Sequence, residues 1–235
     1  GVVVGIVGSS HTATGICGTA GLGKTTTAIW LVRDLRVRTA FRDGIFWLEF
    51  GKDRTAADLL LRLLLKLDVL SSEVESLQRL GVGAMTEAAC QKMRGRRCLV
   101  VLDDVWNDDQ PEPFRDLAGD SVTVLVTTRK SRVLDLFGEQ LGALEPLDSE
   151  GAATLLTLSS GKDAHDLSGD ALTELIRICS GLPAMLRSVG RMSAKLSSDA
   201  VLRFFKEHKL RNGMPDEMAR ADGYQQKAAK GNLFL

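Results

Sequence analysis

The sequence predicts an α/β fold, in which helices cover both faces of a parallel sheet and a small helical subdomain follows. Two observations support this fold class. Short apolar segments alternate with amphipathic segments through the first 146 residues, which is the pattern of βαβ units. After Pro146 the strand-like segments stop and only helical spacing remains. We therefore expect a sheet domain at 1–146, a helical subdomain at 147–210 and a linker segment at 211–235.

Five short apolar segments are predicted to form the strands of the sheet. The segments at 99–102 and 122–126 are rich in β-branched and apolar residues without strict alternation, as expected for strands that are covered on both faces. The predicted strands are Thr14–Cys17, Gly44–Glu49, Cys98–Leu102, Val122–Thr127 and Gly142–Leu144. The sequence does not specify their order in the sheet.

Segments with helical spacing lie between and after these strands. In Lys24–Val37, apolar residues recur on one helical face, and the Gly181 to Pro183 segment is a typical helix stop. The other helices predicted in the sheet domain are Arg54–Leu70, Gly83–Met93 and Ser131–Phe137. Those predicted in the subdomain lie at about 149–158, 172–179 and 184–196, with a last one near 201–205.

A complete phosphate-binding loop, G-x-x-x-x-G-K-[ST], lies between the first predicted strand and the first predicted helix. It reads Gly18-Thr19-Ala20-Gly21-Leu22-Gly23-Lys24-Thr25. Backbone without Cβ can wrap closely around an anion at the positive end of the following helix. We expect Lys24 to reach the β- and γ-phosphates, Thr25 to bind Mg²⁺, and Thr26 to complete the nucleotide site. The motif predicts a P-loop NTPase sheet that binds a mononucleotide.

Acidic residues end a later strand, as phosphate chemistry requires. The segment at 98–102 is followed by Asp103 and Asp104, at the strand end where open α/β sheets bind ligands. Asp103 is predicted to act on the Mg²⁺ side, and Asp104 to orient the attacking water as a catalytic residue. The alternative is that this pair begins a solvated loop, because further polar residues follow. Arg129, after the next strand, is the second predicted catalytic residue, placed to sense or stabilise the γ-phosphate.

The composition excludes several partner classes. Lys and Arg total 30, and Asp and Glu also total 30, so the chain has no net charge that would favour nucleic acid or an anionic membrane. The leucine-rich segment at 59–67 is too short to span a bilayer. Four cysteines show no metal-ligand spacing, which favours buried free thiols and a cytoplasmic location.

Five motifs in this order resemble the NB-ARC domain of the STAND class of signalling ATPases, known from plant disease-resistance proteins and the apoptotic protease-activating factor. They are Gly18–Thr25, Phe46-Trp47, Leu102–Trp106, Thr127–Arg129 and Gly181–Ala184. The resemblance covers about residues 13–210. It implies that Pro183 packs near adenine. It also implies slow Mg²⁺-dependent ATP hydrolysis and a switch between a closed ADP form and an open ATP form that oligomerises. Ala20, Thr27 and Ala184 are mild departures from the family pattern.

The resemblance implies a regulatory module that controls protein assembly in defence or cell-death signalling, with protein partners or self-association in the full-length protein. Residues 232–235 resemble the start of a winged-helix domain, so we expect truncation there. One alternative is a scaffold that binds ADP without hydrolysing ATP. A metabolic or transport ATPase is disfavoured, because the transporter-like segment at 167–170 follows Asp103 and Asp104 instead of preceding them. No Asn-Lys-x-Asp motif for guanine occurs.

Overall fold

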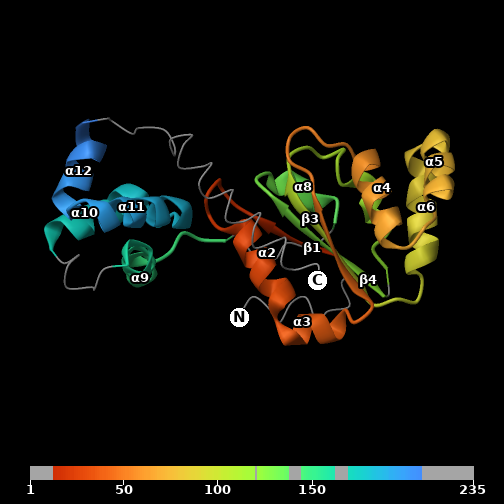
Figure 1. Cartoon of the computed structure of the whole chain (residues 1–235), viewed down its shortest axis with the longest axis horizontal. Helices are drawn as coiled ribbons and strands as arrows, with labels where there is room; N and C mark the ends of the chain where they lie inside the picture. The colour runs from red at the N-terminus through yellow and green to blue at the C-terminus, as the bar shows by residue number, and fades with distance from the viewer. Residues whose placement is uncertain (1–12, 120, 138–143, 162–168, 208–235) are drawn as a thin grey trace. The chain divides into compact units, whose positions relative to one another are not determined.

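The computed structural model describes residues 13–119, 121–137, 144–161 and 169–207 (Figure 1). The chain divides into two compact units. Unit 1 comprises residues 1–19 and 24–144, and unit 2 comprises residues 20–23 and 145–235.

Unit 1 is built on a parallel four-stranded sheet. Its strands are β1 (Ala13–Cys17), β2 (Gly44–Glu49), β3 (Cys98–Val105) and β4 (Val122–Thr128). The order in the sheet is β1-β4-β3-β2, and every neighbouring pair is parallel. The predicted α/β fold with a parallel sheet is confirmed. Of the fifth predicted strand, residues 142–143 lie outside the described residues, and Leu144 belongs to no strand although its N–H donates to the Cys17 carbonyl at 3.3 Å.

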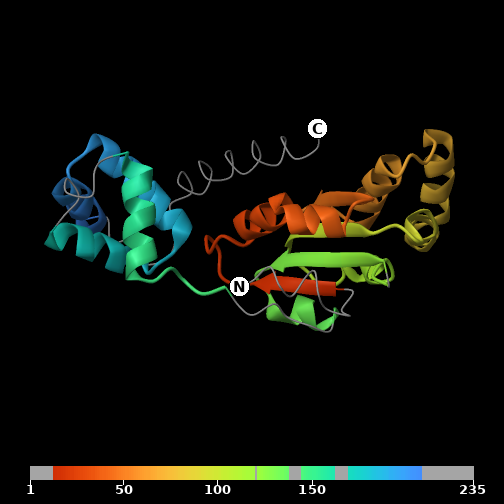
Figure 2. The ribbon, with the colours of Figure 1, turned by 90° about the horizontal axis from the view of Figure 1, so that it is seen from below.

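Helices cover both faces of this sheet. In a view close to the sheet edge, α2 lies on one side and α8 on the other (Figure 2). The helices of unit 1 are α2 (Lys24–Arg33), α3 (Leu35–Ala40), α4 (Ala56–Lys66), α5 (Ser71–Leu80), α6 (Val82–Met93), α7 (Glu112–Arg115) and α8 (Ser131–Asp135).

The structure corrects several predicted helix bounds. The predicted helix Lys24–Val37 is interrupted at Asp34, whose carboxylate accepts the N–H of Arg36 at 2.8 Å and caps a second helix, α3. The predicted helix Arg54–Leu70 is shorter at both ends. A capping box of Thr55 and Asp58 sets the start of α4 at Ala56, and the helix ends at Lys66. Helices α5 and α7 were not predicted. On α5, Val74 is buried and Leu77 packs against the core from a partly buried position, so the helix has only a short apolar face.

The core of unit 1 lies between the sheet and α4. All six residues from Cys98 to Asp103 on β3 are buried, and so are Leu59, Leu60, Leu63 and Leu64 on α4. Phe50 and Phe114 meet edge to face, with their ring centroids 5.7 Å apart. The leucine-rich segment is therefore a core helix. Within the described residues, we find no helix with the length and apolar character to cross a membrane.

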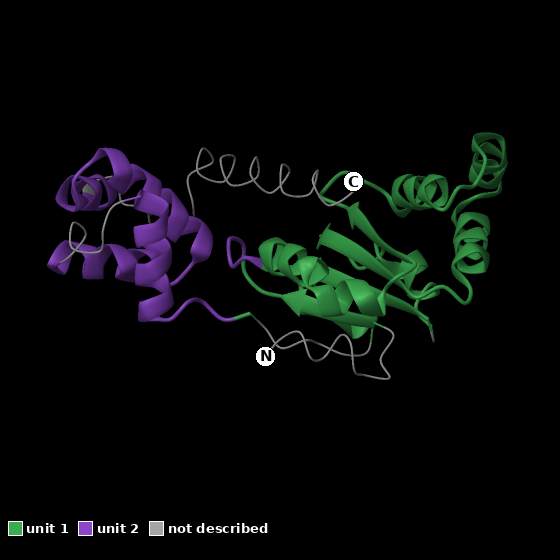
Figure 3. Ribbon diagram, turned by 60° about the horizontal axis from the view of Figure 1, so that its bottom comes forward, with its two compact units in different colours: residues 1–19, 24–144 green, residues 20–23, 145–235 purple. Residues whose placement is uncertain are grey.

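Unit 2 contains a small helical bundle (Figure 3). Its helices are α9 (Ser149–Ser160), α10 (Asp170–Cys179), α11 (Pro183–Lys195) and α12 (Ser198–Glu207). They bury one apolar cluster, made of Ala152, Leu156, Leu175, Cys179, Leu186, Val189, Val201 and Phe205. Leu156, Leu175, Leu186 and Val201, one from each helix, are fully buried, so each helix contributes to a shared core.

Gly181 occupies a tight turn between α10 and α11. Its φ is +67°, and an added Cβ would clash with the backbone carbonyl oxygen of Leu147. Leu147 also donates its N–H to the Gly181 carbonyl at 2.9 Å, so the backbone segment at Leu147 is held against the turn at Gly181. The turn therefore requires glycine both for its conformation and for its close approach.

We expect Gly181→Ala to lower the free energy of unfolding of unit 2 by about 1–3 kcal/mol, because it adds a steric clash to an unfavourable left-handed backbone. Urea unfolding measures the change. Gly161→Ala is the matched control, since Gly161 has a φ of +65° but open space around its Cβ position. Equal losses in the two variants would contradict the close approach between Gly181 and Leu147.

The buried thiols lead to a second expectation. Burial raises the pKa of Cys98 to about 11 and that of Cys179 to about 12, from an ordinary value of 9.0. In a Cys17→Ser, Cys90→Ser background, both thiols should react with Ellman's reagent at pH 8 only as fast as the fold opens. Because folding favours the protonated thiols, their contribution to stability is complete below about pH 9 and is lost as the pH rises through 11 to 12. Rapid labelling of the native protein at pH 8 would contradict this burial.

Candidate functional site

The predicted catalytic and phosphate-binding residues of unit 1 gather at the carboxyl ends of its strands. Lys24 and Thr25 open α2, which follows β1 through the phosphate-binding loop. Asp103 and Asp104 lie near the end of β3, and Arg129 directly follows β4. Since β3 and β4 are parallel neighbours and β4 also pairs with β1, these chain ends share one sheet edge.

Lys24 is a buried cation at this edge. Its side chain amine donates to the carbonyl oxygens of Gly18 and Thr19, each at 2.7 Å, and the residue is only 9% exposed. Burial lowers the pKa of Lys24, and the positive charge of Arg129 lowers it further, while nearby groups including Asp104 oppose these effects. Two cations thus act on the same small region. A polyphosphate would relieve both the desolvation of Lys24 and its repulsion by Arg129.

Asp103 is the centre of a hydrogen-bonded chain. One carboxylate oxygen, Oδ1, accepts from the Thr25 hydroxyl at 2.8 Å and from the Thr127 hydroxyl at 2.7 Å. The Thr127 hydroxyl accepts in turn from the N–H of Asp104 at 2.9 Å. Asp103 is 1% exposed and Thr127 is 1% exposed, so these bonds are shielded from water and hold the Thr25 hydroxyl, the Asp103 carboxylate and the Asp104 backbone in a fixed arrangement.

Asp104 has an unusual backbone. Its φ is +56°, in the left-handed region that few residues other than glycine enter. The regular pairing of β3 with β4 shifts between Leu102 and Val105, so Asp104 sits in an irregularity of the strand. The Thr127 hydroxyl and the N–H of Gly51, which donates to the Asp104 carbonyl at 3.1 Å, hold this conformation. The effect is to turn Asp104 out of the alternation of the strand, and strain of this kind is common at functional sites.

Arg129 and Thr26 are exposed. The guanidinium carbon of Arg129 lies 4.5 Å from the centroid of the Trp106 ring. Within the described part of the chain, no ion pair of Arg129 with a carboxylate is found. Arg129 therefore has an aromatic partner and no carboxylate partner among these residues, and Thr26 is an exposed residue in the first turn of α2.

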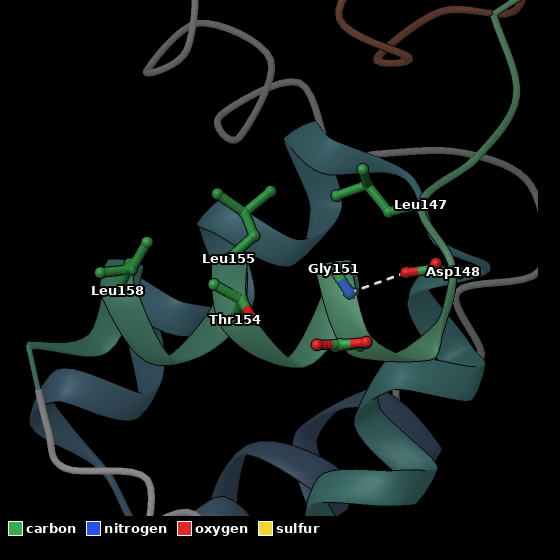
Figure 4. Close-up of a pocket in the computed structure, with 7 residues that line it drawn as sticks. Leu147, Asp148, Gly151, Thr154, Leu155 and Leu158 are labelled. Atoms are coloured by element: carbon green, nitrogen blue, oxygen red, sulfur yellow. Dashed lines mark hydrogen bonds between the residues drawn. The ribbon is translucent and has the colours of Figure 1, made fainter.

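The remaining predicted ligands belong to unit 2. Ala20, Gly21, Leu22 and Gly23 of the loop are grouped with that unit, and so is Pro183, the first residue of α11. Within unit 2, the Ala184 N–H donates to the Gly21 carbonyl at 3.1 Å. A pocket on α9 is lined by other residues of this unit, among them Leu147, Thr154 and Leu158 (Figure 4). None of the predicted site residues lines that pocket.

Two residues of the site were given no role from the sequence. Thr127 appeared only as part of a motif, and its bonds to Asp103 and Asp104 require the pairing of β3 with β4, which the sequence does not reveal. Trp106 likewise appeared as a motif residue, and its contact with Arg129 joins two loops at the sheet edge. With the strand order known, the sequence would have pointed to Thr127, because a threonine near the end of one strand can bond to an acidic residue near the end of the neighbouring strand.

The donor set fits Mg²⁺ with a polyphosphate. The Thr25 hydroxyl and the Asp103 carboxylate present hard oxygen ligands 2.8 Å apart. Among the described residues there is no group of three or more His, Cys, Asp or Glu side chains that could hold a metal alone. Mg²⁺ characteristically takes one or two protein oxygens and completes its octahedron with phosphate and water, so this pair is sufficient.

Known proteins resemble this chain in sequence. The family model of the NB-ARC domain matches residues 7–164. The disease resistance protein RGA2 of Solanum bulbocastanum is 34% identical over 144 residues, which cover 57% of this chain and 13% of that protein. The regulatory protein AfsR of Streptomyces griseus is 26% identical over 196 residues, covering 80% of this chain and 19% of that protein. The chain thus spans about a fifth or less of the length of these curated relatives.

A solved structure shares the fold. It is a Signal Transduction ATPase with Numerous Domains (STAND) protein with a tetratricopeptide repeat sensor, from Pyrococcus horikoshii. The TM-score is 0.57 with 16% sequence identity, over 90% of this chain and 32% of that one. The family model covers well over half of the 235 residues and includes the phosphate-binding loop and both acidic residues of β3. This chain belongs to the NB-ARC domain family.

Proposed function

We propose that this chain is the ADP- and ATP-binding switch module of a larger signalling ATPase. The observation that carries the proposal is the joining of two motifs 78 positions apart, in which the Thr25 hydroxyl donates to the buried Asp103 carboxylate. A buried lysine, Lys24, lies next to Thr25 in the sequence. Membership of the NB-ARC family supports nucleotide binding at this loop.

In this proposal, residues 1–146 form the nucleotide-binding domain and 147–210 the helical subdomain. Backbone amides of Gly18–Gly23 surround the phosphates, and Lys24 supplies the cation that neutralises them. Thr25 and Asp103 hold Mg²⁺, Thr26 lies beside the phosphates, and Pro183 packs near the adenine. Lys24 also bonds to the carbonyls of Gly18 and Thr19, which fixes its amine beside the loop.

Hydrolysis is assigned to two side chains at the edge of the sheet. Asp104, the residue with the left-handed backbone next to Asp103, accepts a hydrogen bond from the attacking water and orients it. Arg129 compensates charge that develops on the terminal phosphate. Bound Mg²⁺ would neutralise part of the phosphate charge. The module is assigned slow turnover, because its product state, with ADP bound, serves as a resting state of the switch.

The larger protein would use this switch to control assembly with protein partners or with further copies of itself. Two relatives support a regulatory setting, since one is called a disease resistance protein and the other a regulatory protein. We place the module in defence signalling and in the cytoplasm. The balanced charge of the chain, with 30 basic and 30 acidic residues, gives no reason to include nucleic acid among its partners.

Two measurements on the purified chain test this function. We expect ADP to co-purify and to be released on heat denaturation, and we expect single-turnover ATP hydrolysis in Mg²⁺ to be far slower than the 1–100 s⁻¹ or so of typical kinases. Rapid multiple turnover with phosphate transfer to a small molecule would identify a metabolic enzyme instead. Tight ADP binding with no hydrolysis at all would identify a scaffold that uses ADP as a structural ligand.

A further inference from the structure

The ring of Trp106 has two cationic neighbours. The guanidinium carbon of Arg129 lies 4.5 Å from the ring centroid, and the Lys52 amine lies 4.7 Å from it. Both distances are within the range of a cation–π interaction. The two cations come from different loops, since Lys52 follows β2 and Arg129 follows β4. Trp106, which follows β3, therefore connects the loops at the ends of three strands.

The backbone of Trp106 is fixed by a buried glutamine. The side chain oxygen of Gln110 accepts the N–H of Trp106 at 2.8 Å and that of Asn107 at 3.1 Å. The side chain nitrogen of Gln110 donates to the carbonyls of Gly51 and Arg54, at 3.1 and 3.2 Å. Gln110 is 6% exposed, so all four bonds are shielded from water. The ring is thus presented from a rigid base, while the Arg129 side chain above it is exposed.

Arg129 has no carboxylate to hold it among the described residues, so the ring is the contact that restrains its long side chain. A phosphate oxygen binds a guanidinium more strongly than an aromatic face does, because the bond is charge-assisted. The site that Arg129 faces also contains Lys24, whose charge repels it. The guanidinium would therefore leave the ring when a terminal phosphate is present and return to it when only ADP remains.

We propose that Trp106 is a positioning residue that restrains Arg129 in the absence of a terminal phosphate, and so sets how strongly the site prefers a nucleoside triphosphate over a diphosphate. This inference rests on the proposed function. In this proposal the contact between the ring and Arg129 is lost when the triphosphate binds but is kept with ADP. Removing the ring should therefore raise the affinity for the triphosphate and leave the affinity for ADP unchanged. A purely structural role of Trp106 predicts the opposite, a loss of affinity for both nucleotides.

Titration calorimetry on the 235-residue chain tests the affinity prediction. We expect Trp106→Leu to bind a non-hydrolysable ATP analogue with Mg²⁺ about 2- to 5-fold more tightly than the unmodified chain, with ADP affinity unchanged. Trp106→Phe keeps an aromatic face, so its affinity for the analogue should lie between those of the unmodified chain and Trp106→Leu. Arg129→Gln should remove the effect of Trp106→Leu, because the restrained group is gone. Weaker binding of the analogue by Trp106→Leu, with or without weaker ADP binding, would overturn the proposal.

A spectroscopic measurement follows the ring itself. The chain has three tryptophans, so labelling with 5-fluorotryptophan gives a small ¹⁹F spectrum in which Trp106→Phe assigns the resonance of interest. We expect this resonance to move with the Mg²⁺–triphosphate analogue and to stay near its nucleotide-free position with ADP. In Lys52→Ala, the matched control, the response to the analogue should persist. A Trp106 resonance that responds equally to both nucleotides would overturn the proposal.

These outcomes separate the inference from the proposed function. If both nucleotides bind and the Trp106 resonance is indifferent to the terminal phosphate, the inference fails and the nucleotide switch stands. If neither nucleotide produces heat in calorimetry with folded protein, the proposed function fails and the inference falls with it.

Discussion

Lys24→Ala should abolish retention of nucleotide by the purified chain. The lysine is buried at the start of α2, and no other lysine is buried among the described residues. Loss of the cation would leave the phosphates without this charge-assisted bond in a shielded site. Breaking a buried ion pair costs about 3 kcal/mol or more, so affinity for ADP should fall by about 100-fold or more.

The measurement is the ADP content of the purified protein, with the dissociation constant by calorimetry. Lys92→Ala is the control, because Lys92 is an exposed lysine on α6 and its removal leaves the site unchanged. Thermal unfolding should show that both variants are folded. Equal ADP retention by the Lys24→Ala and control proteins would show that Lys24 does not bind the phosphates.

Asp104→Asn should spare nucleotide binding but slow hydrolysis. The substitution removes the negative charge that accepts the hydrogen bond of the water and orients it, for which a loss of about 100-fold or more is expected. Asparagine tolerates a left-handed backbone at least as well as aspartate does, so the φ of +56° should be kept and the fold should not be destabilised. The backbone N–H that donates to Thr127 is also retained.

Single-turnover hydrolysis measures the rate, and calorimetry with ADP measures binding. Asp109→Asn is the control, since Asp109 is an exposed acidic residue in the loop that follows β3. Parallel losses of affinity and rate in Asp104→Asn would assign Asp104 to binding and not to the chemical step. An unchanged rate of hydrolysis in Asp104→Asn would show that another residue orients the water.

The strands and the phosphate-binding loop could be predicted from the sequence because each is a pattern within a few consecutive residues. Four predicted strands are present, and the family resemblance drawn from five motifs is confirmed by the family model. The roles assigned to single residues, such as Asp104 and Pro183, stay predictions. The helix break at Asp34 was missed because apolar spacing continues through it, while the capping bond to Arg36 that begins the second helix, α3, is formed by polar atoms.

The arrangement around Asp103 could not be predicted, because it depends on which strands are neighbours. The order β1-β4-β3-β2 puts the end of β4 beside β3, and only then can the Thr127 hydroxyl reach Asp103. The contact of Trp106 with Arg129 has the same origin, since the two residues are brought together by that pairing and not by spacing. The positive φ of Asp104 also follows from the bulge between these strands.

The central claim is that the loop after β1 and the paired acids of β3 form one binding site for an adenine nucleotide. Isothermal calorimetry of the nucleotide-stripped, folded chain with ADP and with an ATP analogue tests it most directly, each with and without Mg²⁺. We predict saturable heat for both nucleotides, and tighter binding of the analogue when Mg²⁺ is present, because Thr25 and Asp103 would then bind the metal. No heat of binding for either nucleotide in folded protein would contradict the claim.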